Sequence, residues 1–152
     1  MITFKTVKVC LLLIFVFVNI FYIAPCYSLV LREDLFKNAL DLSSDGKFNL
    51  ALQEWNRYLD AYPDDAAGLS NRGNVRLVIG DVEGSIDDQN KAISLNPSEI
   101  DPYINRGIAE EALGQWSQAK RDYMFVISQD SKNFSALYNF CLLYTSPSPR
   151  DK

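Results

Sequence analysis

The sequence contains no histidine, and its three cysteines, Cys10, Cys26 and Cys141, all lie outside residues 29–140. Without histidine, the chain has neither an imidazole general base nor an imidazole ligand for a metal ion. Without cysteine, residues 29–140 provide no disulfide, no thiol nucleophile and no cysteine-based metal site. The central part of the chain therefore lacks the commonest catalytic and metal-binding groups, and we expect no cofactor.

Basic residues are in the minority. The chain has 15 Lys and Arg against 19 Asp and Glu, and within residues 29–140 the numbers are 11 and 18. A protein that binds the nucleic acid backbone needs clustered Lys and Arg, and an anionic membrane surface also attracts basic segments. We therefore expect no nucleic acid partner, and contact with a membrane only through the N-terminal segment.

Recognisable catalytic motifs are missing as well. The segment Gly80–Gly84 lacks the lysine of a glycine-rich phosphate loop. The carboxylates Asp87 and Asp88, and likewise Glu110 and Glu111, are sequence neighbours, and neighbours on a helix point about 100° apart. Neither pair converges on one substrate atom, so we predict that the chain is not an enzyme.

Residues 1–28 resemble a targeting segment. Lys5 and Lys8 precede an apolar run over residues 9–24, and polar sequence follows Ser28. The run is shorter than the roughly 20 residues that span a bilayer. The segment predicts a cleaved signal peptide or a retained membrane anchor. We therefore expect an exported or membrane-anchored protein, in a periplasm, a secretory route or a plastid or thylakoid lumen, and not one free in the cytoplasm.

Residues 141–152, CLLYTSPSPRDK, abandon the helical pattern that precedes them. Residues 141–151 match the conceptual translation of a sequencing-library adapter, so we expect a non-native tail. The alternative is a genuine Ser/Pro-rich disordered tail.

The middle of the chain repeats itself every 34 residues. Asn71-Arg72-Gly73 recurs as Asn105-Arg106-Gly107, a Gly-containing turn occurs at residues 46, 80 and 114, and Pro63 recurs as Pro97. This period is typical of helix-turn-helix solenoids. We predict an all-α fold over residues 32–140, with repeats 32–65, 66–99 and 100–133 and the start of a fourth at 134–140.

Small residues are expected where the two helices of a repeat cross. Ala39, Gly73 and Gly107 fall on the first helices, opposite Ala51, Ser85 and Ala119 on the second helices. Small side chains on both sides let the backbones approach closely. The larger residues Phe48, Val82, Trp116, Trp55 and Tyr123 are expected to fill the space around the crossings.

Two further expectations follow from the repeat pattern. Arg72 and Asp88, like Arg106 and Asp122, are 16 residues apart, so each pair is expected to form an ion pair within a helical hairpin. Each repeat covers the outer face of the preceding one. Because the fourth repeat is predicted only over residues 134–140, the residues at the end of the third repeat are expected to be partly uncovered. These are Tyr123, Val126 and Ile127.

The pattern resembles the tetratricopeptide repeat (TPR). The resemblance is carried by Leu35, Gly46, Phe48, Ala51, Trp55 and Pro63, by Leu69, Gly73, Gly80, Ala92 and Pro97, and by Tyr103, Gly107, Gly114, Trp116, Ala119 and Tyr123. The sequence departs from the family where Ala39 replaces Gly, Gln89 replaces an aromatic residue and Ser131 replaces the third Pro. The Asn-Arg-Gly triplets are also similar to repeats of cyanobacterial and plastid proteins.

The resemblance implies antiparallel helix pairs in a right-handed superhelix, with a concave peptide-binding groove lined by the first helices. Transferred to this chain, the candidates are Phe36, Lys37, Leu40, Ser44, Ser70, Asn71, Asn74, Val78, Ile104, Asn105, Ile108 and Glu111. Asn71 and Asn105 can pair with a peptide backbone because an amide both donates and accepts. Alternatively, each amide bonds a neighbouring helix or water.

Some members of the family bind the acidic tails of chaperones through a clamp of Lys, Arg and two Asn. Phe36 and Leu40 stand at the first Lys and Asn positions, Asn71 matches the second Asn, and Asp101 and Asn105 stand at the last Lys and Arg positions. One match in five does not make a clamp, and Asp101 would repel an acidic peptide.

The sequence thus predicts a protein–protein interaction scaffold that binds another protein or peptide. Two alternatives are an assembly factor for a membrane or photosynthetic complex, and the non-catalytic part of a longer enzyme.

Overall fold

The computed structural model describes the backbone of residues 24–145 and the side chains of residues 31–143. The chain divides into two compact units, residues 1–37 and residues 38–152. The described part of the first unit belongs to helix α2 (Ala24–Ser44), whose last residues fall in the second unit. Most of the predicted signal or anchor segment lies outside the described residues. Helix α2 nevertheless begins at Ala24, well before Arg32, where we expected the first repeat to start.

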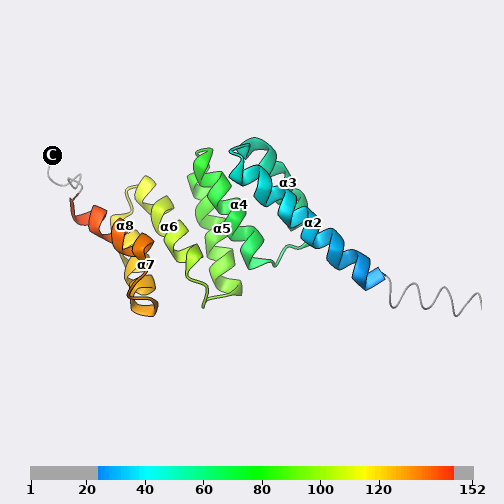
Figure 1. Cartoon of the computed structure of the whole chain (residues 1–152). Coiled ribbons are helices and arrows are strands. Elements are labelled where there is room, and N and C mark those ends of the chain that lie inside the picture. Colours follow the sequence, from blue (N-terminus) through cyan, green and yellow to red (C-terminus); the bar gives the residue numbers. More distant parts are fainter. Residues whose placement is uncertain (1–23, 146–152) are drawn as a thin grey trace, which may run out of the picture. The chain divides into compact units, whose positions relative to one another are not determined.

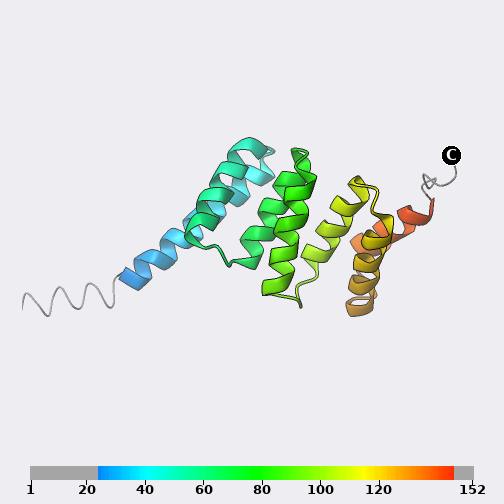
Figure 2. The ribbon, with the colours of Figure 1, turned by 180° about the vertical axis from the view of Figure 1, so that it is seen from behind.

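The second unit is a succession of helices joined by short turns (Figures 1 and 2). After α2 come α3 (Phe48–Ala61), α4 (Ala66–Val78), α5 (Val82–Leu95), α6 (Asp101–Ala112), α7 (Trp116–Gln129) and α8 (Phe134–Thr145). Residues 24–145 contain no strand, which confirms the predicted all-α class. None of the helices in this range combines the length and hydropathy needed to cross a membrane.

The helices of the second unit form two layers. Each helix from α3 to α8 packs against the next, and in addition α4 contacts α6, and α6 contacts α8. Within the described chain, α5 and α7 make no such contact with each other. From α4 onward, the first helices of successive repeats therefore lie closer together than the second helices, and α4, α6 and α8 share one face.

Glycine and aspartate set the ends of the helices. Gly46, Gly80 and Gly114 have φ angles of 74°, 91° and 71°, in the left-handed region that favours glycine. They end the first helix of each repeat, as the 34-residue spacing predicts. At two helix starts, the carboxylates of Asp65 and Asp81 accept hydrogen bonds from the backbone N–H of the residue three positions later.

The helix crossings confirm the predicted close approach. A Cβ added at Gly73 would lie 2.5 Å from Nε2 of Gln89, and one added at Gly107 would lie 2.6 Å from Cε1 of Tyr123. The remaining small residues at the crossings, Ala39, Ala51, Ser85 and Ala119, are all fully buried. A side chain at either glycine would therefore displace the facing side chain, Gln89 or Tyr123.

Each of the two predicted ion pairs is present and includes a third residue. Arg72 donates to both carboxylate oxygens of Asp88, at 2.8 and 2.6 Å, and to Oδ1 of Asn56 at 3.0 Å. One repeat later, Arg106 donates to both oxygens of Asp122, at 2.7 Å each, and to Asn90 at 2.8 Å. Since Asn56 and Asn90 belong to the preceding repeat, each arginine ties three helices together.

Three expectations about the third repeat and the residues after it are wrong. Tyr123 and Val126 are fully buried, because α8 covers them with Ala136, Phe140 and Leu143, and only Ile127 is partly exposed. Residues 141–145 continue α8, so the helical pattern does not stop at residue 140. Trp116 was expected to fill space at a crossing, but 38% of it is exposed because it stands at the turn where α7 begins.

Substitution of Gly107 by Leu tests the helix crossing. The substitution raises helix propensity by roughly 0.8 kcal/mol, yet the new side chain collides with the Tyr123 ring. We expect a net loss of about 1–3 kcal/mol in the free energy of unfolding, measured by thermal melts followed by circular dichroism. Ala112→Leu, which adds bulk at an exposed position of the same helix, is the control. Equal melting of both variants and the parent chain would contradict the crossing.

Candidate functional site

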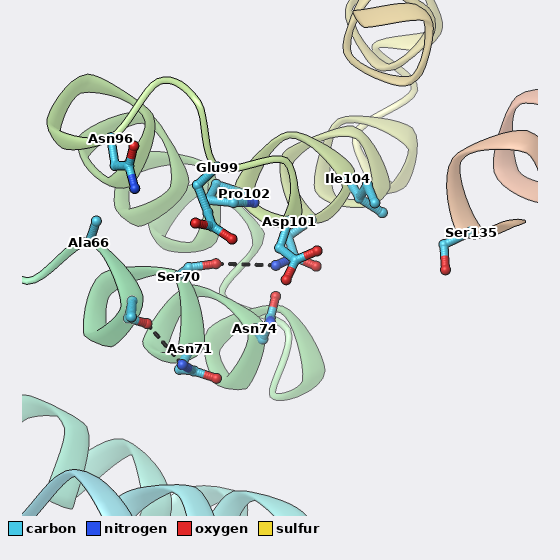
Figure 3. Close-up of a pocket in the computed structure, with 12 residues that line it drawn as sticks. Ala66, Ser70, Asn71, Asn74, Asn96, Glu99, Asp101, Pro102, Ile104 and Ser135 are labelled. Carbon is cyan, nitrogen blue, oxygen red and sulfur yellow. Dashed lines mark hydrogen bonds between the residues drawn. The ribbon is translucent and has the colours of Figure 1, made fainter. Parts of the chain in front are cut away.

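A cleft of about 360 Å³ opens on the face formed by the first helices of the repeats (Figure 3). Helices α4 and α6 form its two long sides, the loop between α5 and α6 closes one end, and α8 contributes one residue. The residues that line it are Ala66, Ala67, Ser70, Asn71, Asn74, Asn96, Glu99, Asp101, Pro102, Ile104, Asn105 and Ser135.

The cleft brings together five of the candidates from the sequence. These are Ser70, Asn71, Asn74, Ile104 and Asn105. Of the remaining candidates, Leu40 and Ile108 have exposed side chains outside the cleft, and Glu111 is partly buried. Phe36 belongs to the first compact unit and stays a prediction.

Sequence reasoning did not identify every residue of the cleft. Asn96 and Glu99 come from the loop between α5 and α6, which the repeat pattern treats only as a helix boundary, and Ser135 comes from α8. The sequence did contain a signal for Glu99, because it lies two residues before Asp101, the first residue of the groove-lining helix α6. Loop residues of this kind become neighbours of the groove only through the stacking of the repeats.

The asparagines of the cleft already make hydrogen bonds within the chain. Asn71 donates from Nδ2 to the carbonyl of Ala67 in its own helix at 2.9 Å, and Asn105 donates to Oγ of Ser70 at 3.2 Å (Figure 3). Oδ1 of Asn74 accepts a hydrogen bond from Gln89 at 3.4 Å. The side-chain oxygens of Asn71 and Asn105 accept no hydrogen bond from the described chain. Both residues therefore still offer an acceptor to a ligand.

The charge of the cleft is negative. Glu99 and Asp101 are its only ionised lining residues, and both are carboxylates. In Figure 3, Asp101 and Asn74 point into the same space between α4 and α6. No group of three or more metal-ligating side chains occurs in the part of the chain that the structure describes. The cleft is suited to recognise hydrogen-bond donors and positive charge.

A buried residue on the second helix of each repeat makes a hydrogen bond to the first helix. Nε1 of Trp55 donates to Ser43 at 3.0 Å, Gln89 donates to the Ser70 carbonyl at 3.0 Å, and the Tyr123 hydroxyl donates to Oε1 of Glu111 at 2.5 Å. The last bond explains why Glu111 is held against α7. Burial, reinforced by this hydrogen bond, raises the pKa of Tyr123.

Glu110, next to Glu111, has an unfavourable environment. It is 7% exposed, its Oε2 has no hydrogen-bond partner, and its Oε1 lies 4.0 Å from Nε of Arg106. Arg106 is already paired with Asp122, which also raises the pKa of the Arg106 guanidinium. Burial, assisted by the charge of Asp122, raises the pKa of Glu110 to about 7.

The corresponding position of the second repeat is Arg76, whose Nε lies 3.4 Å from Asp88. The second repeat therefore places two arginines around Asp88, with Asp81 also 3.6 Å from Arg76, whereas the third repeat groups two carboxylates with one arginine. Because Arg106 is shared with Asp122, Glu110 is left without a cation of its own.

No family model matches the chain. One similar protein is the TPR repeat-containing thioredoxin TDX of Arabidopsis thaliana, 31% identical over 84 residues, an alignment that covers 55% of this chain and 22% of that protein. The chain thus spans about a fifth of that relative's length.

Solved structures match over most of the chain. The first TPR of Spaghetti (RPAP3), bound to the HSP90 peptide SRMEEVD, has a TM-score of 0.72 and 25% identity and covers 76% of this chain and 91% of that one. The second TPR domain of human RPAP3, in complex with the HSP70 peptide SGPTIEEVD, has a TM-score of 0.68 and 24% identity and covers 72% and 92%.

The raised pKa of Glu110 makes stability depend on pH. The pKa in the folded protein, about 7, is higher than in the unfolded chain, so the folded state binds this proton more tightly. The contribution of this proton to the free energy of unfolding is fully present below about pH 4.5, and it is lost as pH rises through 7. We expect Glu110→Gln to stabilise the protein at pH 8 by about 1–3 kcal/mol and to have much less effect at pH 5.

Urea unfolding at the two pH values measures this difference. Glu83→Gln removes one negative charge at an exposed position of α5 and serves as the control. A Glu110→Gln effect that is the same at both pH values, or that matches the control, would contradict the assigned titration.

Proposed function

We propose that this chain, a tetratricopeptide-repeat protein, is a protein-interaction scaffold whose cleft between α4 and α6 binds an extended, neutral or basic segment of another protein. The single observation that carries the proposal is the lining of the cleft. Polar side chains from successive groove-forming helices meet there, and the only ionised residues among them are Glu99 and Asp101.

Chemistry in the cleft favours a ligand that donates hydrogen bonds. Besides the two carboxylates, the free side-chain oxygens of Asn71 and Asn105 are acceptors. Backbone N–H groups, Lys and Arg are the donors that a protein segment offers. A partner with Lys or Arg side chains would gain attraction that increases as water leaves the cleft.

Two similar solved structures hold a peptide ligand, but this chain differs in charge from the family's acidic-tail clamp. The two RPAP3 domains are solved in complex with peptides that end in EEVD, which are acidic. In this chain, Asp101 and Asn105 occupy positions where the family's acidic-tail clamp has Lys and Arg. We therefore propose that the scaffold does not bind acidic tails, and that its role is binding and not catalysis.

The proposed scaffold acts in an exported or membrane-anchored protein. Support for this location comes from the apolar run over residues 9–24 and the basic residues before it. The run itself lies outside the described residues. Through it, the protein would contact a membrane, while the repeats bind the protein partner.

Fluorescence anisotropy with labelled peptides tests the proposed charge preference. The acidic peptide SRMEEVD and its basic counterpart SRMKKVK, both with an amidated C-terminus, are compared at 50 and 300 mM salt. We expect SRMKKVK to bind at least about tenfold more tightly than SRMEEVD, with a preference that weakens at the higher salt concentration. Equal or tighter binding of SRMEEVD would overturn the proposal.

A matched pair of double variants separates the cleft from the net charge of the protein. Glu99→Gln with Asp101→Asn should lower the affinity for SRMKKVK by roughly five- to twentyfold. Asp60→Asn with Asp87→Asn removes the same charge at exposed positions of α3 and α5 and should leave the affinity within about twofold. Similar losses in both variants would show that the basic peptide binds the general surface and not the cleft.

A further inference from the structure

The second repeat has a glutamine where its neighbours have aromatic residues. Gln89 corresponds to Trp55 and Tyr123 at the 34-residue spacing, and all three are fully buried. Gln89 lies on α5, behind the helix that lines the cleft, and is not itself one of the lining residues. Gly73 makes room for it, since a Cβ there would collide with the Gln89 amide.

The hydrogen bonds of Gln89 fix the direction of its amide. Nε2 lies 3.0 Å from the backbone oxygen of Ser70, which can only accept, so the nitrogen and not the oxygen must face it. The same nitrogen lies 3.4 Å from Oδ1 of Asn74. Oε1 of Gln89 is buried without a partner, so this direction is kept although it leaves one oxygen unsatisfied.

The orientation of the Gln89 amide sets the orientation of the side-chain amide of Asn74, which lines the cleft. Because the oxygen of Asn74 is turned to Gln89, its Nδ2 is left to donate elsewhere, and it makes no donor bond to the described chain. Across the cleft, Asn105 donates from Nδ2 to Ser70 and keeps its Oδ1 unoccupied. The cleft therefore offers a donor from α4 and an acceptor from α6.

We infer that Gln89 is a positioning residue for ligand binding: it turns the Asn74 amide so that a donor faces the carbonyl groups of an extended protein segment. The inference rests on the proposed function. A peptide group presents one N–H and one C=O, so it matches the acceptor of Asn105 and the donor of Asn74. The other polar groups of the cleft are mostly acceptors. A ligand carbonyl needs a donor, so its binding depends on the orientation of the Asn74 amide.

A first measurement needs no peptide. In the full chain, the side-chain amide signals of Asn74 are compared by NMR between the parent protein and Gln89→Met, which keeps the length of the side chain but removes the donor. We expect the Asn74 signals to shift and their relaxation to show a more mobile amide. Tyr123→Phe removes the corresponding hydrogen bond in the third repeat and should leave Asn74 unchanged. Unchanged Asn74 signals in folded Gln89→Met would overturn the inference.

A second measurement tests the effect on binding with the peptide SRMKKVK. Gln89→Met should weaken binding about three- to tenfold, the size of one lost hydrogen bond. In an Asn74→Ala background, the same substitution should cause no further loss, because Gln89 acts through Asn74. Melting by circular dichroism confirms that each variant is folded.

The outcomes separate the inference from the proposed function. If the parent chain binds SRMKKVK but Gln89→Met weakens binding equally with and without Asn74, Gln89 acts only on the fold and the inference is wrong. If the parent chain does not bind the peptide while the Asn74 signals respond as expected, the proposed function is wrong, and with it the role of Gln89 in binding.

Discussion

The second unit depends on how closely the two helices of each repeat approach each other. At Gly73 and Gly107, the space that a Cβ would need is occupied by the side chain of the facing helix. Glycine inside a helix lowers its stability by up to about 1 kcal/mol relative to Ala. That cost is offset by the packing of Gln89 and Tyr123, both fully buried, against the glycine backbone.

The close approach also explains how the groove side chains are supported. Once Tyr123 and Gln89 reach the first helices, their polar ends can bond Glu111, Ser70 and Asn74. The arginines provide a second kind of support, since Arg72 and Arg106 each join the preceding repeat to both helices of their own. Packing within repeats and hydrogen bonds between repeats together fix the spacing of α4 and α6, and hence the width of the cleft.

The 34-residue period was sufficient to predict the helix order, the glycine turns, the crossings and both arginine pairs, because each follows from residues that recur at fixed spacing. It failed at α8, where residues 141–145 extend the helix and where Ala136, Phe140 and Leu143 cover Tyr123 and Val126. A resemblance to an adapter translation says nothing about helix propensity, and Cys141 to Tyr144 are compatible with a helix. Periodicity likewise identified groove positions such as Asn74 but not the loop residue Glu99, whose place depends on stacking.

We propose above all that the face formed by α4, α6 and α8 is the binding surface. Chemical-shift mapping of the full chain during titration with SRMKKVK tests it most directly. We expect the largest changes on Ser70, Asn74, Asp101 and Asn105. Changes concentrated on the solvent-facing residues of α5 and α7, with the cleft unaffected, would contradict it.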